Sequence, residues 1–214
     1  MKICVLFDLD GTLLDTLEDL TDGVNYALAC FGLPQRTLEE IRSFIGNGAG
    51  LLIQRASGNA ENWREIFACY KEYYDSHCQI KTKPYHGVLE AIQQLQQEYP
   101  IAIVSNKQDE AVKMLCADYF PGVYALGETP DCPRKPAPDM LRKAMAAVGA
   151  DRCVYVGDSE VDIITAENVG CPCVSVVWGF RDENTLRQYG AKYCCGDARL
   201  LPNDIKNAIK EYYG

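Results

Sequence analysis

Residues 3–12 read ICVLFDLDGT, and they decide which fold the sequence predicts. The first five are an unbroken apolar run, which is typical of a strand buried on both faces in a parallel sheet. Asp8 and Asp10 follow directly, at the carboxyl end of that strand, where open α/β sheets bind their ligands. Alternate positions on a strand point to the same side, so we expect these two carboxylates to lie close together.

Two like charges held close together are costly unless a cation neutralises them. Mg²⁺ is the natural candidate, because it takes oxygen ligands and keeps waters that a substrate phosphate can replace. The pair Asp8 and Asp10, followed by the turn at Gly11 and Thr12, therefore predicts a site for Mg²⁺ and a phosphate group.

The composition bounds the class of protein. A chain of 214 residues can form one good core with room for an inserted subdomain. Its net charge of -9 argues against non-specific binding to nucleic acid or to an anionic membrane. No apolar run approaches the ~20 residues of a membrane span, and no signal peptide is visible. We therefore expect a cytoplasmic protein whose partner is neither nucleic acid nor membrane.

The cysteines support the same compartment. Their number, eleven, is odd, and several fall in expected strands, where a thiol acts as a small apolar group. This pattern suits a reducing cytosol better than a disulfide framework. The cysteine pairs at 171 and 173 and at 194 and 195 lack C-x-x-C spacing, so we expect no zinc site there.

Strand and helix patterns alternate along most of the chain, which is the signature of a parallel sheet with covering helices. The sequence therefore predicts an α/β fold, a Rossmann-like parallel sheet with helices on both faces. After the first strand, we expect strands at 101–104, 122–125, 153–156 and 173–177. We expect helices at 87–98, 108–117, 138–148, 161–168 and 204–212.

The stretch 16–83 breaks this alternation, because it contains helical patterns but no convincing strand. Its helices are expected at 17–30, 38–44, 49–56 and 62–78. We interpret it as an all-helical insertion that follows the carboxyl end of the first strand. The predicted domains are therefore a core formed by residues 1–15 and 84–214, and an α-helical cap formed by residues 16–83.

Polar and charged residues recur after the later strands as well. Ser105 and Asn106 follow the strand at 101–104 and are expected to lead into a helix, whose first backbone N–H groups can bind phosphate oxygens. Lys135 precedes Pro136, which favours an extended conformation for Lys135 and so keeps it outside the next helix. An ammonium fixed there could neutralise a nucleophile and a phosphoryl oxygen.

A second pair of carboxylates lies in the motif GDSEVD, after the strand at 153–156. Asp158, at the end of the strand, is placed to join Asp8 on the metal, and Asp162 lies one helical turn further on, in support. Capping of the following helix by Asp158 or Ser159 explains the same residues and is compatible with metal binding.

Taken in order, these motifs resemble the haloacid dehalogenase-like hydrolase superfamily, in its phosphatase branch. The resemblance covers nearly the whole chain, and within the superfamily it is strongest to the phosphoglycolate phosphatase group. The superfamily motifs are DLDGT at 8–12, Ser105, Lys135 and GDSEVD at 157–162. The motifs shared with the group are LLDT at 13–16, FIGNGA at 44–49, KPAP at 135–138 and WGFR at 178–181.

The resemblance implies a reaction through an aspartyl-phosphate. Asp8 would be the nucleophile that attacks phosphorus. Asp10 would protonate the leaving-group oxygen and then activate the water that hydrolyses the intermediate. Mg²⁺ would be held by the Asp8 carboxylate, the Asp10 backbone carbonyl, Asp158 and waters.

The resemblance also implies a phosphate-binding set. Ser105 and the backbone N–H of Asn106 would hold the phosphoryl group together with Thr12, and Lys135 would compensate its charge. Asp162 would support the metal site.

Substrate choice is expected to come from the cap, because the core recognises only phosphate and metal. Gly46, Asn47 and Gly48 offer backbone N–H groups that could bind a small anionic group such as a carboxylate. A plain turn between two helices explains the same residues equally well.

The sequence therefore predicts a Mg²⁺-dependent phosphatase that acts on a small phosphorylated metabolite, with 2-phosphoglycolate as the best single candidate. An inorganic pyrophosphatase, a nucleotide or sugar phosphatase and a β-phosphoglucomutase-like enzyme remain open within the same fold. A non-catalytic regulator is the alternative from another class, although such a protein has no need for both Asp8 and Asp10. The oligomeric state stays open.

Overall fold

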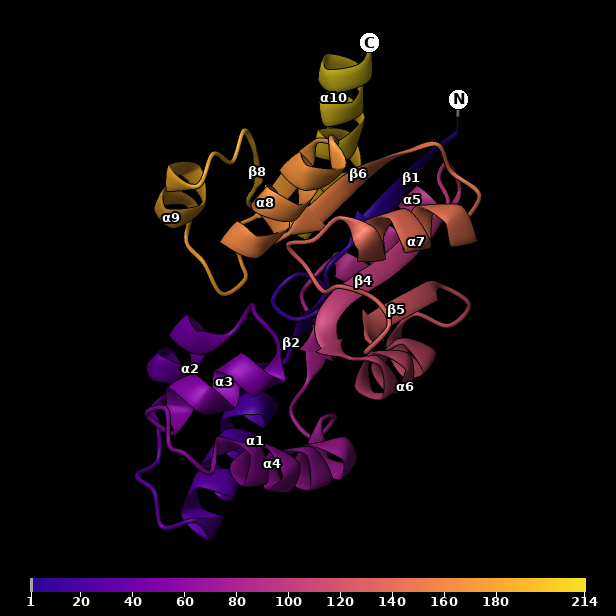
Figure 1. The fold of residues 1–214 in the computed structure, drawn as a ribbon. Coiled ribbons are helices and arrows are strands. Elements are labelled where there is room, and N and C mark those ends of the chain that lie inside the picture. Colours follow the sequence, from indigo (N-terminus) through magenta and orange to yellow (C-terminus); the bar gives the residue numbers. More distant parts are fainter. Residues whose placement is uncertain (1) are drawn as a thin grey trace. The chain divides into compact units, whose positions relative to one another are not determined.

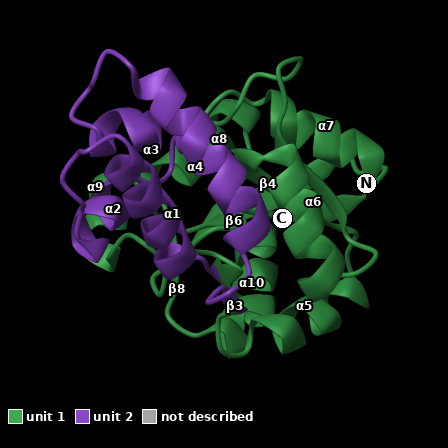
Figure 2. Cartoon of the chain, turned by 90° about the horizontal axis from the view of Figure 1, so that it is seen from below, with its two compact units in different colours: residues 1–14, 84–214 green, residues 15–83 purple. Residues whose placement is uncertain are grey.

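The computed structural model describes residues 2–214. The chain divides into two compact units (Figure 2). Unit 1 comprises Met1–Leu14 and Pro84–Gly214, and unit 2 comprises Asp15–Lys83. Two short strands, β2 (Leu14–Asp15) and β3 (Lys83–Pro84), pair with each other where the chain passes between the units.

Unit 1 contains a six-stranded parallel sheet in the order β5-β4-β1-β6-β7-β8 (Figure 1). β1 lies at the centre, and the chain adds strands first on one side of it and then on the other. Such a change of direction creates the crevice at the carboxyl ends where α/β proteins bind ligands. The strands are β1 (Ile3–Phe7), β4 (Ile101–Gln108), β5 (Tyr124–Glu128), β6 (Arg152–Gly157), β7 (Cys173–Val176) and β8 (Tyr193–Cys195).

Helices cover both faces of this sheet, as the sequence predicted. Cys4 and Leu6 share a buried cluster with residues of α7 and α8, while Val5 and Phe7, on the opposite face of β1, are also fully buried. α10 packs on β6, β7 and β8 and against α5, and α6 packs on β4 and β5 (Figure 1). The helices of unit 1 are α5 (Val88–Gln96), α6 (Asp109–Tyr119), α7 (Asp139–Ala147), α8 (Glu160–Val169), α9 (Glu183–Gln188), the short 3₁₀ helix η1 (Ala198–Leu200) and α10 (Leu201–Tyr213).

Unit 2 is helical, with α1 (Leu17–Cys30), α2 (Leu38–Phe44), α3 (Ala49–Ala56) and α4 (Trp63–His77). α1 and α4 cross closely at Gly23, where a Cβ atom would lie 3.1 Å from the Tyr70 ring. Asp19 accepts hydrogen bonds from the backbone N–H groups of Lys81 (3.0 Å) and Thr82 (2.8 Å), which ties the end of the unit to its first helix. The helices expected in this stretch are confirmed within one residue at each end.

One expectation about local structure is wrong. Ser105 and Asn106 do not begin a helix, because β4 continues to Gln108 and α6 starts at Asp109. The strand continues because its pairing with β5 resumes at Gln108 after a shift of register that follows Val104. β8 and α9 were not expected at all. Within residues 2–214, no helix is both long and apolar enough to span a bilayer.

Candidate active site

Three carboxylates meet at the carboxyl ends of β1 and β6. Asp8 follows β1, Asp158 follows β6, and Asp162 lies in the first turn of α8. One carboxylate oxygen from each lies within 4.8 Å of the others, and all three residues are buried. β1 and β6 are neighbours in register, so their ends bring Asp8 and Asp158 together. The predicted association of Asp158 and Asp162 with Asp8 is therefore present in the structure.

The Lys135 ammonium lies among these carboxylates. Its Nζ is 2.9 Å from Asp8 Oδ1 and 2.8 Å from Asp162 Oδ1, and it donates to the Tyr155 hydroxyl at 2.6 Å. Asn106 fixes the backbone of this lysine: its amide donates to the Lys135 carbonyl and accepts from the Lys135 N–H, both at 2.9 Å. The structure thus places the Lys135 ammonium beside Asp8, with its backbone held by Asn106, and its role toward a phosphoryl group stays a prediction.

Asp158 is held by two donors. The Thr12 hydroxyl donates to its Oδ1 at 3.1 Å, and the Phe180 N–H donates to its Oδ2 at 2.7 Å. Glycines allow the backbone to come this close: a Cβ atom at Gly11 would lie 2.3 Å from Asp158 Oδ2, and one at Gly179 would lie 2.5 Å from it. Thr12 thus orients a carboxylate, and its predicted contact with phosphate stays a prediction.

Asp162 combines a structural role with a place in the cluster. Ser159 is the N-cap of α8, and its N–H (3.1 Å) and Oγ (2.6 Å) both donate to Asp162 Oδ2, in a capping box. Asp162 Oδ1 accepts from Lys135 and from the Tyr155 hydroxyl, the latter at 2.9 Å. These bonds occupy both oxygens of Asp162, and its support of a metal site stays a prediction.

Asp10 lies outside this cluster of three. Its carboxylate accepts hydrogen bonds from the Lys107 ammonium at 3.0 and 3.3 Å. The side chains of Asp10 and Lys107 are 13% and 6% exposed, so the pair is largely shielded from water. The Lys107 N–H in turn donates to Ser105 Oγ at 3.2 Å, which leaves the Ser105 hydroxyl proton available to another acceptor. Ser105, Lys107 and Asp10 are thus linked by hydrogen bonds near the carboxyl ends of β1 and β4.

Burial and excess negative charge shift the ionisation of the cluster. Burial raises the pKa of Asp8 to about 7, although Lys135 opposes the shift. Burial, followed by the charges of Asp162 and Asp8, holds the pKa of Asp158 well above its ordinary value. Burial alone would lower the pKa of Lys135, but Asp162 and Asp8 outweigh it and raise that pKa, so the ammonium stays charged. The cluster holds more negative charge than the lysine neutralises.

The residues fit a hard divalent cation. Asp8 Oδ1 is buried, and its partner among the described residues is the Lys135 ammonium, 2.9 Å away. One oxygen from each of three carboxylates lies within 4.8 Å of the others, and carboxylate oxygen is the ligand that Mg²⁺ and similar ions prefer. A cation there would lower the pKa values of Asp8 and Asp158, which burial raises most and the neighbouring carboxylates raise further.

The predicted cap residues belong to unit 2. Gly46, Asn47 and Gly48 connect α2 to α3, with positive φ values of 123° at Gly46 and 81° at Gly48. Gly48 is the N-cap of α3. Their role in binding substrate stays a prediction.

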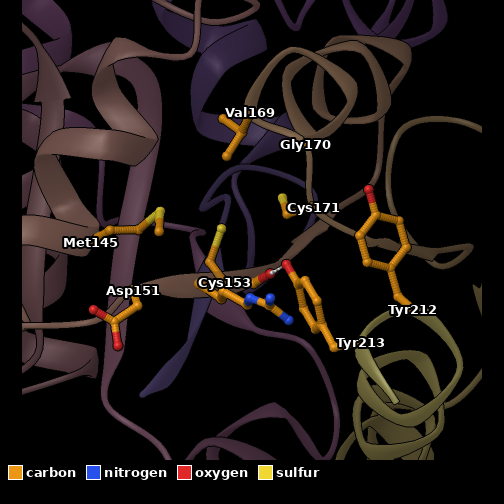
Figure 3. Close-up of a pocket in the computed structure, with 9 residues that line it drawn as sticks. Met145, Asp151, Cys153, Val169, Gly170, Cys171, Tyr212 and Tyr213 are labelled. Carbon is orange, nitrogen blue, oxygen red and sulfur yellow. Dashed lines mark hydrogen bonds between the residues drawn. The ribbon is translucent and has the colours of Figure 1, made fainter. Parts of the chain in front are cut away.

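A pocket of about 460 Å³ lies at the opposite edge of the sheet from the carboxylates (Figure 3). Arg152 and Cys153 line it and begin β6, whereas Asp158 follows the end of that strand. Figure 3 shows the Tyr213 hydroxyl directed at Cys153, whose carbonyl accepts its hydrogen bond at 2.9 Å. This pocket is separate from the candidate active site.

Two residues at the site were missed from the sequence, Lys107 and Tyr155. Lys107 lies two positions after Ser105, and the expected strand was ended too early to place it at the site. Tyr155 lies inside an apolar strand, and the sequence gives no sign that its hydroxyl reaches Lys135 and Asp162.

Comparisons with known proteins agree with this geometry. The family model of the haloacid dehalogenase-like hydrolases matches residues 5–176. A phosphoglycolate phosphatase of Neisseria meningitidis serogroup A is 34% identical, over 98% of this chain and 91% of the relative. Phosphoglycolate phosphatase 1 of Pseudomonas aeruginosa is 32% identical, over 92% of this chain and 78% of the relative.

A solved structure from Lactobacillus delbrueckii subsp. bulgaricus, assigned provisionally to the phosphoglycolate phosphatases, is also similar. It superposes with a TM-score of 0.90 at 37% identity, covering 94% of this chain and 97% of that one. Sequence motifs, fold and site geometry lead to the same family. The chain belongs to the haloacid dehalogenase-like hydrolases, in the group that is similar to phosphoglycolate phosphatases.

Proposed function

We propose that this hydrolase is a Mg²⁺-dependent phosphatase that cleaves a small phosphomonoester through an aspartyl-phosphate on Asp8. The carrying observation is the cluster of Asp8, Asp158, Asp162 and Lys135, with the carboxylate of Asp10 close by on Lys107. A module that only binds a metabolite has no need for a buried carboxylate whose charge is not fully neutralised. A carboxylate that attacks phosphorus does need such a position, where a cation can compensate its charge.

In this proposal, an oxygen of the Asp8 carboxylate forms a bond to phosphorus while the bond to the leaving oxygen breaks. Asp10 gives its proton to that oxygen. In the second half, Asp10 takes a proton from water, the water oxygen bonds to phosphorus, and the bond to Asp8 breaks to release phosphate. Each half needs Asp10 in the opposite protonation state, so one residue serves both.

The chain's own groups would hold the phosphoryl oxygens. Ser105 Oγ has a proton to donate, because its observed partner, the Lys107 N–H, donates to it. The Lys135 ammonium is fixed by Asn106 next to Asp8, where it can neutralise a phosphoryl oxygen. The Asn106 N–H and Thr12 complete the proposed set.

Mg²⁺ would be held by Asp8, Asp158 and the backbone carbonyl of Asp10. When bound, it supplies positive charge that neutralises the phosphoryl group and the attacking carboxylate. The cluster of three buried carboxylates, which has one ammonium among them, supports this assignment.

2-Phosphoglycolate is the substrate that we propose, because the relatives that match nearly the full chain are phosphoglycolate phosphatases. We propose that unit 2 acts as a cap that contributes to substrate choice, with the turn at Gly46, Asn47 and Gly48 as its candidate contact. We also propose a reducing, cytoplasmic location, which is supported by the eleven cysteines, all of them free thiols.

Phosphate release from a panel of esters tests the proposal. The panel contains 2-phosphoglycolate, pyrophosphate, nucleoside monophosphates, sugar phosphates and an aryl phosphate, each with Mg²⁺ and with EDTA. We expect 2-phosphoglycolate to be preferred, and chelation and Asp8→Asn each to abolish the activity. Broad weak activity would remove the substrate assignment, and isomerisation of a sugar phosphate would indicate a mutase. Activity that persists in Asp8→Asn would contradict the mechanism.

A further inference from the structure

Lys107 is placed at the site by the irregular end of β4. The register of β4 against β5 shifts between Val104 and Gln108, and Lys107 lies within this shifted part. Gly127 of β5 makes the arrangement possible: a Cβ atom there would lie 2.7 Å from the Lys107 carbonyl oxygen and 2.4 Å from Asp109 Cα. The strand irregularity therefore holds the lysine at a defined position beside Asp10.

The charge compensation of the nucleophile does not depend on this lysine. Lys135 already contacts Asp8 and Asp162. Lys107 instead bonds both oxygens of Asp10 through one Nζ. Its ammonium thus lies next to the group that would give its proton to the leaving oxygen.

The position of the Lys107 ammonium next to Asp10 determines which part of a substrate it can contact. When Asp10 reaches the leaving oxygen, the atoms attached to that oxygen must pass close to the groups that touch Asp10. A carboxylate one carbon from the oxygen has the shape and charge of the Asp10 carboxylate and can take its place on the ammonium. Arg181, another cation near the end of the sheet, donates to Glu160 at 2.9 Å.

We infer that Lys107 selects phosphomonoesters that carry a carboxylate one carbon away from the ester oxygen, by binding that carboxylate with its ammonium. The inference rests on the proposed function and deepens it, since it assigns recognition of the leaving group to a residue of the core. 2-Phosphoglycolate belongs to this class. Nucleoside and aryl phosphates do not.

Two matched esters test this inference. 2-Phosphoglycolate and 2-hydroxyethyl phosphate share the same skeleton, but a neutral hydroxymethyl group replaces the carboxylate in the second. We expect Lys107→Met to lower the ratio of their kcat/KM values by roughly 10- to 100-fold, mainly through a higher KM for 2-phosphoglycolate, because a charge pair shielded from water is lost. Lys107→Arg should restore part of the preference.

Lys113→Met is the matched control. Lys113 lies on α6, pairs with Asp109, and has a side chain that is 63% exposed, so its removal should leave the ratio unchanged. Equal losses on both esters in Lys107→Met would show that the lysine acts only through Asp10 and would overturn the inference. An unchanged ratio would do the same.

A binding measurement separates this inference from the proposed reaction. In the Asp8→Asn background, calorimetry with Mg²⁺ compares the affinities for both esters, with and without Lys107→Met. The inference expects tighter binding of 2-phosphoglycolate that Lys107→Met removes, even if the wild-type protein releases no phosphate from either ester. Equal affinities for the two esters with Lys107 present would overturn it.

Discussion

Two lysine–aspartate contacts lie at the same edge of the sheet and differ in the carboxylate that each lysine holds. Lys135 contacts Asp8, Asp162 and Tyr155, and Asn106 bonds its backbone on both sides. Lys107 bonds Asp10, whose side chain is 13% exposed. Lys135 therefore contacts the candidate nucleophile within the buried cluster of three carboxylates, whereas Lys107 contacts a carboxylate outside that cluster.

The two contacts correspond to two requirements of phosphoryl transfer, charge compensation at the nucleophile and proton exchange with the leaving group. The charge around the nucleophile must already be in place, because the barrier is lowered by groups that do not reorganise during reaction. The group that exchanges protons must be able to change partner within each turnover. We therefore interpret the Lys135 side as fixed and the Lys107 side as exchangeable.

The largest expected effect is on turnover, when Asp10 is replaced by a residue that cannot transfer a proton. Asp10→Asn should lower kcat by roughly 10²- to 10⁴-fold, since an amide cannot give or take the proton. Its fold and metal binding should persist, because Asp10 lies outside the cluster of three carboxylates. Steady-state kinetics with 2-phosphoglycolate measure this effect. Near-normal turnover would contradict the assignment of Asp10 as the group that transfers the proton.

Loss of the fixed ammonium should act on stability as well. Lys135→Met should lower the free energy of unfolding in EDTA by about 3–5 kcal/mol, because it leaves Asp8 and Asp162 buried without their partner. Urea unfolding measures the effect. The exposed Lys113→Met serves as control and should leave the free energy of unfolding nearly unchanged. If the two variants lower the free energy of unfolding equally, the Lys135 contacts do not stabilise the site.

The pH dependence of stability tests whether the charges of the buried carboxylates are compensated without a cation. The pKa of Asp8 is raised from 3.8 to about 7, so between these values the folded protein binds more protons than the unfolded chain. The free energy of unfolding in EDTA should therefore fall as the pH rises through this window, and Asp158 acts in the same direction. Mg²⁺ should stabilise more at the upper end, because it binds the deprotonated carboxylates.

Urea unfolding at several pH values with EDTA checks this expectation, with Asp8→Asn as the variant that should flatten the profile. Stability that rises with pH across the window would mean that the carboxylates are already compensated without a cation.

The smallest expected effect concerns unit 2. Gly48→Val should raise KM for 2-phosphoglycolate several-fold and spare an aryl phosphate, if the turn at 46–48 contacts the substrate. Gly58→Val is the matched control, because Gly58 also has a positive φ, 69° against 81° at Gly48, in another turn of the same unit. Equal effects of Gly48→Val on both esters would leave selection to the core.

Much of this arrangement follows from the sequence because it depends on strand ends. The apolar run at Ile3–Phe7 predicted a buried strand with Asp8 at its carboxyl end, and the run at 153–156 predicted another with Asp158 at its end. Lys135 could be expected outside a helix because a proline follows it. These features depend on neighbouring residues in the sequence, so sequence patterns are enough to predict them.

The parts that were missed depend on packing between distant segments. The extension of β4 past Val104 follows from its pairing with β5, which no pattern in residues 101–108 shows. Tyr155 fits an ordinary buried strand, and only the fold brings its hydroxyl to Lys135. The three-residue β8 completes the sheet edge through pairing with β7 rather than through its own propensity.

The most direct test of the account is to find where the phosphoryl group goes. The protein is mixed with 2-phosphoglycolate and Mg²⁺, quenched with acid within a turnover, and digested for mass spectrometry, with Asp8→Asn in parallel. We predict a phosphoryl adduct on the peptide that contains Asp8, and neither adduct nor released phosphate in the variant. An adduct on another residue, or phosphate release by Asp8→Asn at the wild-type rate, would contradict the account.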